Sequence, residues 1–457
     1  MKFKSLETKN YILKKFKISD VNIKYLNWLK DKKNSKYLTN HQFKNIFELK
    51  RYVSKNFLNQ KSLFLKILTK NYVHIGNLRI HDVNKEKNSA FLGIFVGDIK
   101  QKNKGIAQEV IHYICKFLFA KYKISKVFLG VDQKNKSAVN AYLKSGFIFH
   151  KKKKNLMFRD YYVTKLCIGT AQIGSHYGIA NQTGIVKTKD IKKIKKFALS
   201  NGIRTIDTAR SYGLNAEGEK RLANIGVNEF VTLGKLPVSE PDKNRVNWVI
   251  KNIKLSLKNL KLKTFNTVFV HNVNFLFDSN GKKIYEGLIK AKKIGLIKNI
   301  GVSTYTIEEI KNIIKKFREI NVIMLPFNLF DQRPLDTNIL KELTRLKIEI
   351  YARSAFLQGL ILIDYKKIPK KFYKWQKKFK DLDLLSKKLK MKKYEICLRY
   401  VLSNPYLDKV VVGSDNFSQL KKLTTIAKKG FIKLSIKKFK SNNEIDLINP
   451  SKWPNLK

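Results

Sequence analysis

The sequence predicts an α/β protein: a mixed α/β domain followed by a parallel (β/α)8 barrel of the TIM type. Eight short apolar runs lie between residues 166 and 412, and helical patterns separate them. This alternation over about 260 residues matches the strand number and the size of such a barrel. The region before residue 164 instead mixes helical and strand-like stretches in irregular order.

The chain divides where this pattern changes, near Thr164. We expect the mixed α/β domain over residues 1–163 and the barrel over residues 164–432. A basic tail, residues 433–457, is expected to dock on or near the barrel through Trp453. The eight predicted barrel strands are residues 166–170, 204–207, 230–235, 267–271, 298–303, 322–325, 349–353 and 409–412.

The first domain contains both helical and strand-like patterns of apolar residues. Apolar residues three or four apart predict helices, whereas apolar and polar residues in alternation predict strands. The predicted helices are residues 19–38, 46–57, 106–121 and 137–145. The predicted strands are residues 62–68, 74–80, 90–97, 126–130 and 160–163.

Charge dominates the composition: 95 lysines and arginines against 34 aspartates and glutamates give a formal net charge of +61. Proteins that bind nucleic acid usually cluster such charge on one face and favour arginine. Here lysine is spread over both halves and arginine is scarce. We therefore interpret the charge as a compositional bias and expect no specific nucleic acid partner, although so positive a field favours anionic ligands.

The three cysteines, Cys115, Cys167 and Cys397, are far apart and show neither metal-binding nor redox spacing. This pattern favours a reducing compartment over a disulfide framework, and it predicts no metal site. No stretch reaches the roughly 18 apolar residues of a membrane span, and the N-terminus lacks the apolar core of a secretion signal. We expect a cytoplasmic protein that does not insert into membranes.

Four polar side chains follow three consecutive predicted strands of the barrel: Asp207, Tyr212, Lys235 and His271. Active sites of such barrels lie at the C-terminal ends of the strands, so these four are candidate catalytic residues. Together they suit the reduction of a carbonyl group. Tyr212 would supply the proton, and Lys235, kept charged by Asp207, would lower the cost of ionising that phenol. His271 would donate a hydrogen bond to the carbonyl oxygen.

Further motifs make residues 165–430 resemble the aldo-keto reductases. They include the opening strand Leu166-Cys-Ile-Gly-Thr170, the segment Asp207-Thr-Ala-Arg-Ser-Tyr-Gly213 and the loop Ser354-Ala-Phe-Leu-Gln-Gly359. The resemblance implies a reduced nicotinamide cofactor, NADPH or NADH, bound across the top of the barrel without a metal. It assigns cofactor contacts to Ser303, Asn328, Arg353, Ser354, Leu357, Gly413, Ser414, Asp415 and Gln419.

The sequence departs from the pattern of this family at three positions. Met324 stands where the family usually has a glutamine that holds the carboxamide of the cofactor. Arg353 occupies the position of the aromatic residue that stacks on the nicotinamide, although a guanidinium plane can also stack. Asp415 replaces an arginine that many members place near the 2′-phosphate, so the choice between NADPH and NADH is left open.

A second pattern lies in the first domain, where a turn with a glycine joins a predicted strand to a predicted helix. Such a turn presents backbone N–H groups at the positive end of a helix dipole, which suits a pyrophosphate. Downstream, Asn135 and Ser137 are expected to cap a helix that carries Tyr142. The residues of the turn are Gln101, Lys102, Asn103, Lys104, Gly105, Ile106 and Ala107.

These two motifs resemble the GNAT N-acetyltransferases, in the branch that includes ribosomal-protein and amino-sugar acetyltransferases. The resemblance implies acetyl-CoA as cofactor, with its pyrophosphate held by the turn. It also implies that Tyr142 is the general acid for the departing thiolate, although a packed core aromatic is the alternative for this residue. The base that deprotonates the amine is left open among His81, Asp82 and Glu109.

The sequence as a whole predicts a bifunctional enzyme that joins an N-acetyltransferase to an NAD(P)H-dependent carbonyl reductase. Both would act on small molecules, most plausibly nucleotide-activated amino sugars destined for surface glycans. One alternative is a protein N-terminal acetyltransferase fused to a general aldehyde or ketone reductase. Another is a basic, non-enzymatic protein that binds nucleic acid. The sequence predicts no oligomeric state.

Overall fold

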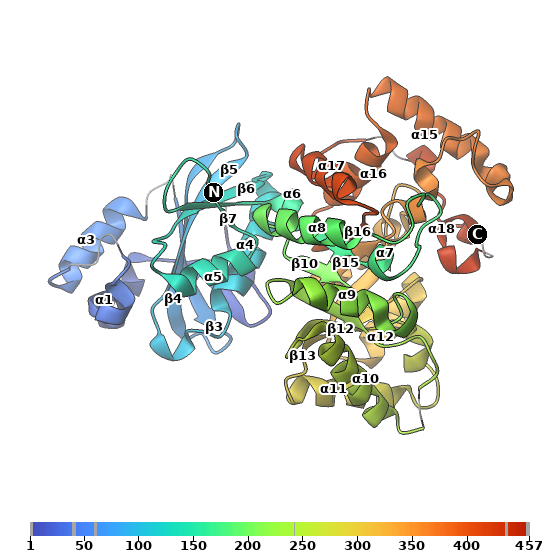
Figure 1. The fold of residues 1–457 in the computed structure, drawn as a ribbon. Helices are drawn as coiled ribbons and strands as arrows, with labels where there is room; N and C mark the ends of the chain where they lie inside the picture. The colour runs from blue at the N-terminus through green and yellow to red at the C-terminus, as the bar shows by residue number, and fades with distance from the viewer. Residues whose placement is uncertain (1–2, 39–42, 59–61, 242, 435–436, 454–457) are drawn as a thin grey trace. The chain divides into compact units, whose positions relative to one another are not determined.

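The computed structural model describes residues 3–38, 43–58, 62–241, 243–434 and 437–453. It divides into two compact units, Met1–Tyr161 and Tyr162–Lys457 (Figure 1). The expected combination of a mixed α/β domain and a closed parallel barrel is confirmed. Each unit has its own hydrophobic core, and we describe the two separately.

In the described part of the first unit, eight strands form one sheet in the order β1-β2-β3-β4-β5-β6-β8-β7. All neighbours are antiparallel except β5 and β6, which are parallel. The strands are β1 (Ser5–Glu7), β2 (Tyr11–Lys15), β3 (Leu63–Thr69), β4 (His74–Asn84), β5 (Ser89–Val96), β6 (Lys126–Gly130), β7 (Ile148–Phe149) and β8 (Leu156–Asp160).

The helices of this unit are amphipathic, and their apolar faces are buried. In the longest, apolar side chains recur every three or four residues from Val110 to Leu118 and are buried. The helices are η1 (Ile18–Asp20), α1 (Ile23–Lys30), α2 (Lys32–Ser35), α3 (Ile46–Asn56), η2 (Ile99–Gln101), α4 (Ile106–Tyr122), α5 (Lys136–Lys144) and, at the start of the second unit, α6 (Tyr161–Thr164).

Strands β5 and β6 pair over a short stretch and then part. Their register joins Ser89 to Lys126 and ends with Phe91 opposite Phe128. Because β5 continues to Val96, its last residues lie beyond this pairing, at the end of the strand that leads into α4. A gap in the ladder here exposes backbone groups to a ligand, next to the turn that precedes α4.

Two predictions for this region were wrong. The expected helix over residues 19–38 is interrupted at Asp31, whose backbone is extended and whose carboxylate caps α2 by accepting the Asn34 N–H. The expected strand over residues 160–163 is a helical turn. Tyr161, Tyr162 and Val163 are all buried, which a half-buried strand with alternating faces does not allow. The strand of this region is β8, and β1, β2 and β7 were not predicted.

In the second unit, eight parallel strands close into a barrel in the order β10-β11-β12-β13-β14-β15-β16-β9. All eight were predicted, with ends that differ by one or two residues. They are β9 (Leu166–Gly169), β10 (Thr205–Asp207), β11 (Val231–Lys235), β12 (Phe265–Val270), β13 (Ile297–Ser303), β14 (Ile320–Pro326), β15 (Glu349–Arg353) and β16 (Lys409–Gly413).

Helices surround the barrel strands (Figure 1). The principal ones are α8 (Thr188–Ser200), α9 (Glu217–Ile225), α10 (Arg245–Leu260), α11 (Gly281–Lys293), α12 (Ile307–Lys316), α14 (Ile339–Arg345), α16 (Lys393–Leu402) and α17 (Phe417–Lys428). A further helix of 13 residues, α15 (Gln376–Lys388), precedes α16. Shorter elements are α7 (Ala171–Gly174), η3 (Leu214–Ala216), η4 (Val273–Leu276), α13 (Arg333–Asp336), η5 (Leu357–Leu362) and η6 (Lys370–Trp375).

The interior of the barrel is filled by side chains from several strands, among them Cys167, Leu233, Phe269 and Met324. Phe269 fits because its partner on β13 is Gly301, where an added Cβ would lie 2.6 Å from the Phe269 ring. The Met324 side chain is 1% exposed and belongs to this packed core. It therefore fills the barrel and is not available to hold a cofactor amide.

The C-terminal segment packs on the region that follows β15. It contains η7 (Lys437–Phe439), α18 (Ile445–Ile448) and η8 (Pro450–Lys452). Phe439 is fully buried, and the Trp453 ring packs edge-on against Phe372 with centroids 5.2 Å apart. Of the basic tail predicted over residues 433–457, residues 435–436 and 454–457 lie outside the described residues.

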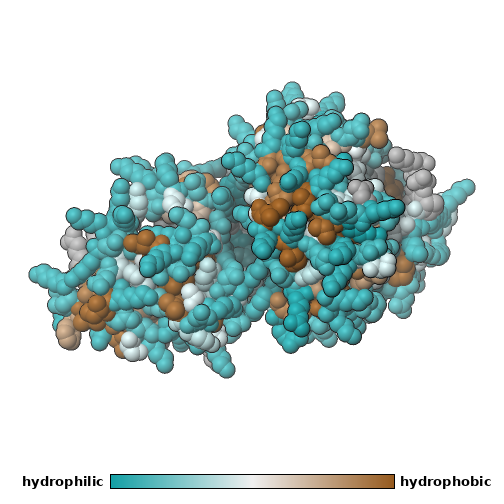
Figure 2. All heavy atoms as spheres, turned by 90° about the horizontal axis from the view of Figure 1, so that it is seen from below, coloured by the Kyte–Doolittle hydropathy of each residue, from teal (hydrophilic) through white to brown (hydrophobic). Residues whose placement is uncertain are grey.

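The visible face in Figure 2 is mostly hydrophilic, with apolar patches between the polar side chains. This fits a chain in which 28% of the residues are charged. Within the described ranges, the helices are either too short or too polar to span a bilayer.

Candidate active sites

The four predicted catalytic residues of the barrel come from neighbouring strand ends. Asp207 closes β10, Lys235 closes β11, and His271 follows directly after β12. Tyr212 lies in the loop after β10. Because β10, β11 and β12 are parallel neighbours, their C-terminal ends meet at one end of the barrel.

Three of these side chains make direct contact. The Lys235 Nζ atom lies 2.5 Å from Asp207 Oδ1 and donates a hydrogen bond to the Tyr212 hydroxyl at 3.1 Å. The Tyr212 hydroxyl lies 3.4 Å from Asp207 Oδ2. The Lys235 and Asp207 side chains are only 3% and 4% exposed, so water hardly screens this pair. The structure thus joins a phenol to a buried ammonium.

Three glycines that the sequence reasoning missed fix the position of Tyr212. A Cβ on Gly174 would lie 2.0 Å from the Tyr212 carbonyl oxygen, and one on Gly213 would lie 2.2 Å from the Gly174 oxygen. Gly213 also has a left-handed backbone with φ of +88°. The Gly218 N–H donates to the Tyr212 carbonyl at 3.0 Å. The only sequence signal was the glycine at each of these three positions.

Burial and nearby charges set the protonation of this site. Burial, with further contributions from Lys235 and Arg353, lowers the pKa of His271 to about 3, so the imidazole is neutral at pH 7. Its Nδ1 atom is buried and has no hydrogen-bond partner among the described residues. Burial, and then Asp207, raise the pKa of Tyr212 well above its ordinary value. The free site therefore holds Tyr212 protonated.

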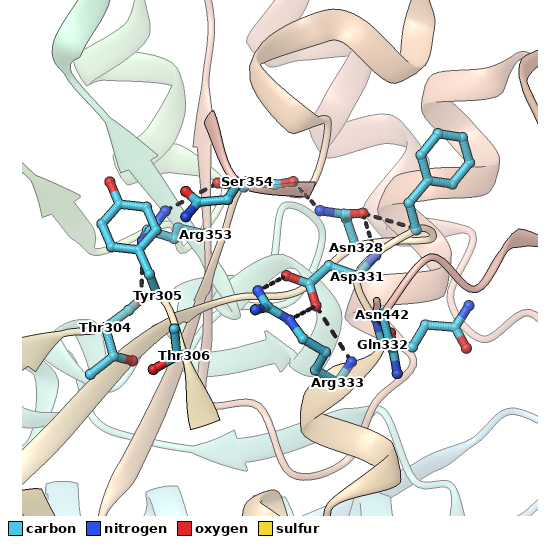
Figure 3. Close-up of polar contacts among 12 residues, drawn as sticks. Thr304, Tyr305, Thr306, Asn328, Asp331, Gln332, Arg333, Arg353, Ser354 and Asn442 are labelled. Carbon is cyan, nitrogen blue, oxygen red and sulfur yellow. Dashed lines mark hydrogen bonds and ion pairs between the residues drawn. The ribbon is translucent and has the colours of Figure 1, made fainter. Parts of the chain in front are cut away.

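The predicted cofactor residues Ser303, Asn328 and Ser354 lie at or just after the ends of β13, β14 and β15, at the same end of the barrel as the catalytic residues. Ser303 and Asn328 are buried. The Asn328 side chain donates to the Ser354 carbonyl at 3.1 Å, and its oxygen accepts two backbone N–H groups, from Phe330 and Asp331 (Figure 3). Asn328 thereby holds the turn at Ser354, whose φ is +60°.

Leu357 is placed differently from the other predicted cofactor residues. Its side chain is fully buried in a hydrophobic cluster, and its N–H already donates to the Ser354 carbonyl at 2.9 Å. It shapes the loop from inside. It offers a ligand neither its amide nor its side chain.

The guanidinium of Arg353 lies over the Tyr305 ring, 4.1 Å from the centroid, and donates to the Thr304 carbonyl at 2.9 Å (Figure 3). A longer contact of 3.4 Å reaches the Ser354 hydroxyl. The Arg353 Nε atom is buried and has no partner among the described residues. The side chain is therefore held firmly in place with part of its hydrogen-bonding capacity unused.

The last predicted cofactor segment joins β16 to α17. Gly413 lies against Gln172, whose Nε2 atom would be 2.2 Å from an added Cβ, and Ser414 is buried. Asp415 and Gln419 bond to each other: the Asp415 N–H donates to Gln419 Oε1 at 2.8 Å, and Gln419 Nε2 donates to Asp415 Oδ2 at 3.1 Å. The N-terminus of α17 next to them suits a phosphate, whereas the Asp415 carboxylate disfavours one.

These features fit a dinucleotide. The ends of β13, β14, β15 and β16 bring the predicted residues to the end of the barrel that carries the catalytic contacts. The unpartnered Nδ1 of His271 and Nε of Arg353 show that this end has polar atoms left for a ligand.

In the first unit, the predicted turn of residues 101–107 leads directly into α4. Asn103 and Gly105 have left-handed backbones with φ of 63° and 77°, and no side chain caps the helix. The N–H groups of the first turn of α4 therefore have no intrahelical partner, and the turn is open to solvent. Lys104 donates to Gln101 Oε1 at 3.3 Å, and burial lowers the pKa of Lys102. This geometry, beside the parting of β5 and β6, fits a pyrophosphate.

The helix α5 carries the predicted acid. Asn135 caps it by accepting the Ala138 N–H at 3.2 Å, but Ser137 is not a cap, because it lies inside the first turn. Tyr142 is 8% exposed, and burial raises its pKa to about 12. The described residues offer its hydroxyl no hydrogen-bond partner. The phenol thus stays protonated at neutral pH, and its proton is available to a ligand.

The structure separates the three candidate bases of the acetyltransferase. The Glu109 carboxylate accepts hydrogen bonds at 2.6 to 2.7 Å from the Thr8 hydroxyl and from the backbone and side chain of Asn10. It thereby ties the β1–β2 turn to α4, which is a structural task. His81 and Asp82 instead form a pair, 2.9 Å apart, at the irregular end of the β4–β5 ladder. This pair is the stronger candidate.

A parallel barrel with an ammonium, a carboxylate, a phenol and an imidazole at its C-terminal end defines a class of barrel oxidoreductases. The chain belongs to the aldo/keto reductase family, whose model matches residues 165–446. Residues 10–148 match the model of the acetyltransferase (GNAT) domain. The predicted fusion of these two domains is confirmed, and both domains belong to families of enzymes.

Similar proteins come from plants and bacteria. A soybean (Glycine max) NAD(P)H-dependent 6′-deoxychalcone synthase is 27% identical over 158 residues, which are 30% of this chain and 49% of that protein. Methylglyoxal reductase DkgB of Salmonella typhi is 31% identical over 114 residues, 24% of this chain and 42% of that protein. The chain thus spans about half the length of the curated relatives it matches.

Among solved structures, aldo-keto reductase AKR11C1 from Bacillus halodurans is similar, with 16% identity and a TM-score of 0.48. The likeness covers 60% of this chain and 90% of that one.

From the low pKa of His271 we predict how this residue titrates in the folded protein. The pKa of His271 is about 3 in the folded chain, against 6.5 for a free imidazole. Between these two pH values the unfolded chain binds a proton at this residue and the folded chain does not. This residue therefore lowers the stability of the barrel as the pH falls from about 6.5 towards 3. In NMR spectra of histidine-labelled protein, the His271 signal, assigned with His271→Gln, should stay that of a neutral ring from pH 8 to pH 5. A midpoint near 6.5 would contradict this.

Proposed function

We propose that the chain is a bifunctional enzyme: an NAD(P)H-dependent carbonyl reductase in the barrel and an acetyl-CoA-dependent N-acetyltransferase in the first unit. The contact of Tyr212 with the buried Lys235–Asp207 pair carries the reductase proposal. The open turn before α4 and the protonated Tyr142 on α5 support the acetyltransferase.

In the reductase, each residue has a separate task. Tyr212 donates its proton to the carbonyl oxygen of the substrate, and the Lys235 ammonium, 3.1 Å from that hydroxyl, supports the phenolate that results. Asp207 keeps Lys235 charged in its buried position. His271, neutral at pH 7, donates one hydrogen bond that orients the carbonyl and stabilises the charge that develops on its oxygen.

When bound, NADPH or NADH would supply the hydride. We propose that Ser303, Asn328 and the turn at Ser354 hold the nicotinamide half, and that residues 413–419 hold the adenosine half. The Asp415–Gln419 contact disfavours a 2′-phosphate, so both cofactors are candidates. The departures at Met324 and Asp415 concern cofactor binding and leave the proton-donating group intact.

In the acetyltransferase, residues 102–107 would bind the pyrophosphate of acetyl-CoA through backbone N–H groups, and Asn135 and Ser137 would lie close to the same cofactor. Tyr142 donates the proton of its hydroxyl to the departing thiolate. Because the CoA thiol resembles cysteine in acidity, with a pKa near 8.5, this buried phenol is the weaker acid, and complete transfer of its proton requires that the bound ligand lower the pKa of Tyr142. His81, paired with Asp82, is the proposed base for the amine.

We propose amino sugars activated by nucleotides as the substrates, in a cytoplasmic pathway that makes surface glycans. Amine acetylation and a redox step at the carbonyl level are both needed to make such modified sugars, and one chain carries both sites. A protein N-terminus is the alternative acceptor.

The acceptor class is tested with a panel. Purified protein and acetyl-CoA are incubated with UDP- and dTDP-linked amino sugars and, separately, with short peptides, and the products are identified by mass spectrometry. Acetylated sugars support the proposal, whereas peptides that outcompete every sugar, or no product at all, contradict it.

Tyr212→Phe removes the proton donor of the reductase. We expect kcat for aldehyde reduction to fall by about 100- to 10,000-fold, the usual contribution of a general acid. The Kd for NADPH should change by less than about twofold, because the backbone of residue 212 and its glycine neighbours are untouched. Tyr373→Phe, at an exposed tyrosine of the same unit, is the matched control. Loss of cofactor binding together with activity would show that Tyr212 has a structural role.

Tyr142→Phe removes the proposed acid of the acetyltransferase. We expect acetyl transfer to slow by about 10- to 100-fold, with reductase activity unchanged because the two sites lie in different units. The thiol released from acetyl-CoA is measured with a disulfide dye. Tyr72→Phe, at an exposed tyrosine of the first unit, is the control. Full acetyltransferase activity in Tyr142→Phe would contradict this role and would show that Tyr142 is only a packed aromatic residue of the core.

A further inference from the structure

Arg353 is distinctive because this chain uses arginine sparingly. Only 12 of its 95 basic residues are arginines. Where a positive charge alone suffices, the composition favours lysine, so the arginines that remain are informative. Several make contacts that need a planar fork: Arg221 binds two carbonyls, Arg333 binds both oxygens of Asp331, and Arg399 binds Glu395 and two carbonyls.

Arg353 differs from Arg333 and Arg399 in having no carboxylate partner, and from Arg221 in having a buried Nε atom that makes no hydrogen bond to any described residue. No carboxylate among the described residues lies within ion-pair distance of its guanidinium. The two acidic groups nearest to the site are engaged elsewhere: Asp207 pairs with Lys235 at 2.5 Å, and Asp331 pairs with Arg333 at 2.6 Å. The hydrogen-bond partners of Arg353 among the described residues are a carbonyl and a hydroxyl, and its Nε atom is buried without any. Asp331 feels the charge of Arg353 but is paired with Arg333, so Arg353 has no ion-pair partner of its own among the described residues.

The surroundings hold this charge in a fixed place. Phe327 donates its N–H to the Arg353 carbonyl, and the buried Asn328 fixes the turn at Ser354 (Figure 3). On the other side, the guanidinium lies over the Tyr305 ring. The Tyr305 N–H in turn donates a hydrogen bond to the Glu309 carboxylate at 2.6 Å. A partly buried cation that is kept rigid in this way is pre-organised for a ligand, because little side-chain entropy remains to be lost.

The charge acts on the reaction centre. Arg353 contributes to the lowered pKa of His271 and acts on Tyr212 in the same direction. Asp207 and Lys235 cancel each other, and His271 and Tyr212 are neutral. The charges of Asp207, Tyr212, Lys235, His271 and Arg353 therefore sum to one positive charge, which is that of Arg353.

We propose that Arg353 selects carbonyl substrates that carry an acidic group, a carboxylate or a phosphate, and binds that group beside Tyr212 and His271. This rests on the proposed reductase function. It moves Arg353 from the nicotinamide, where the family resemblance places it, to the substrate. A nicotinamide ring is neutral when reduced and positive when oxidised, so it offers a guanidinium no opposite charge. An acidic substrate does, and a planar fork binds a carboxylate or phosphate through two hydrogen bonds.

The test compares acidic substrates with neutral ones of the same skeleton. We would measure NADPH oxidation by the full chain with 4-carboxybenzaldehyde and 4-formylbenzamide, and with glyceraldehyde 3-phosphate and glyceraldehyde. The wild type should prefer at least one acidic member by about 10-fold or more in kcat/KM. The pair with the larger ratio tells whether a carboxylate or a phosphate is the preferred group.

Arg353→Gln should lower kcat/KM for the acidic substrate by about 10- to 100-fold and for its neutral partner by less than about threefold. Arg353→Lys, which keeps the charge without the fork, should fall between. Arg345→Gln removes the same charge from the exposed side of α14 and should change nothing. The Kd for NADPH, from fluorescence titration, should stay within about twofold in every variant.

Equal losses on the acidic and neutral substrates, no acid preference in the wild type, or a weakened Kd for NADPH in Arg353→Gln would each overturn this assignment while leaving the reductase in place. Failure of the wild type to bind either NADPH or NADH, or to reduce any of the four aldehydes with either cofactor, would overturn the reductase itself and this inference with it. If Arg353→Gln unfolds, Arg353→Lys decides alone: a loss confined to the acidic substrates supports the assignment, and an equal loss refutes it.

Discussion

The chemistry of the barrel depends on one ion pair that is almost completely removed from water. Burying two charges costs several kcal/mol for each ion, and the cost is recovered only when the geometry is exact and the remaining bonds are satisfied. Parallel pairing provides that geometry here, because Asp207 lies opposite Leu233 in the register, two residues before Lys235. The ammonium then has a fixed carboxylate on one side and a phenol on the other. Everything else at this end of the barrel is arranged around that pair.

Much of the barrel could be read from the sequence, because its signals are local. Each strand is an apolar run, and each catalytic side chain closes or follows one, so the positions of the strand ends are enough to predict that Asp207, Lys235 and His271 lie at one end of the barrel. The break at Asp31 and the helical turn at Tyr161 were missed for the opposite reason. They depend on a cap and on packing against residues distant in the sequence, such as Phe119, whose ring stacks on Tyr161 at 4.1 Å.

The electrostatic state of the site was the least predictable part. The sequence suggested that Lys235 would make Tyr212 more acidic, but desolvation raises the pKa of this buried phenol, and the same carboxylate that holds Lys235 also repels a phenolate. The sequence also could not predict whether Glu109 is a catalytic base or a structural residue, because its hydrogen-bond partners Thr8 and Asn10 lie about a hundred positions away in the chain. Residue type and spacing identify candidate groups, whereas burial decides which form of each group is present.

The segment around Ser441 and Asn442 reaches into the loop that follows β14. Ser441 donates its N–H to the Phe330 carbonyl, and Asn442 accepts the Gln332 N–H (Figure 3). That loop also contains Asn328, which secures the turn at Ser354. During synthesis on the ribosome, the loop therefore emerges more than a hundred residues before its last anchors do. The barrel can close its strands early, but its mouth acquires a final shape only after Ser441 and Asn442 have been made.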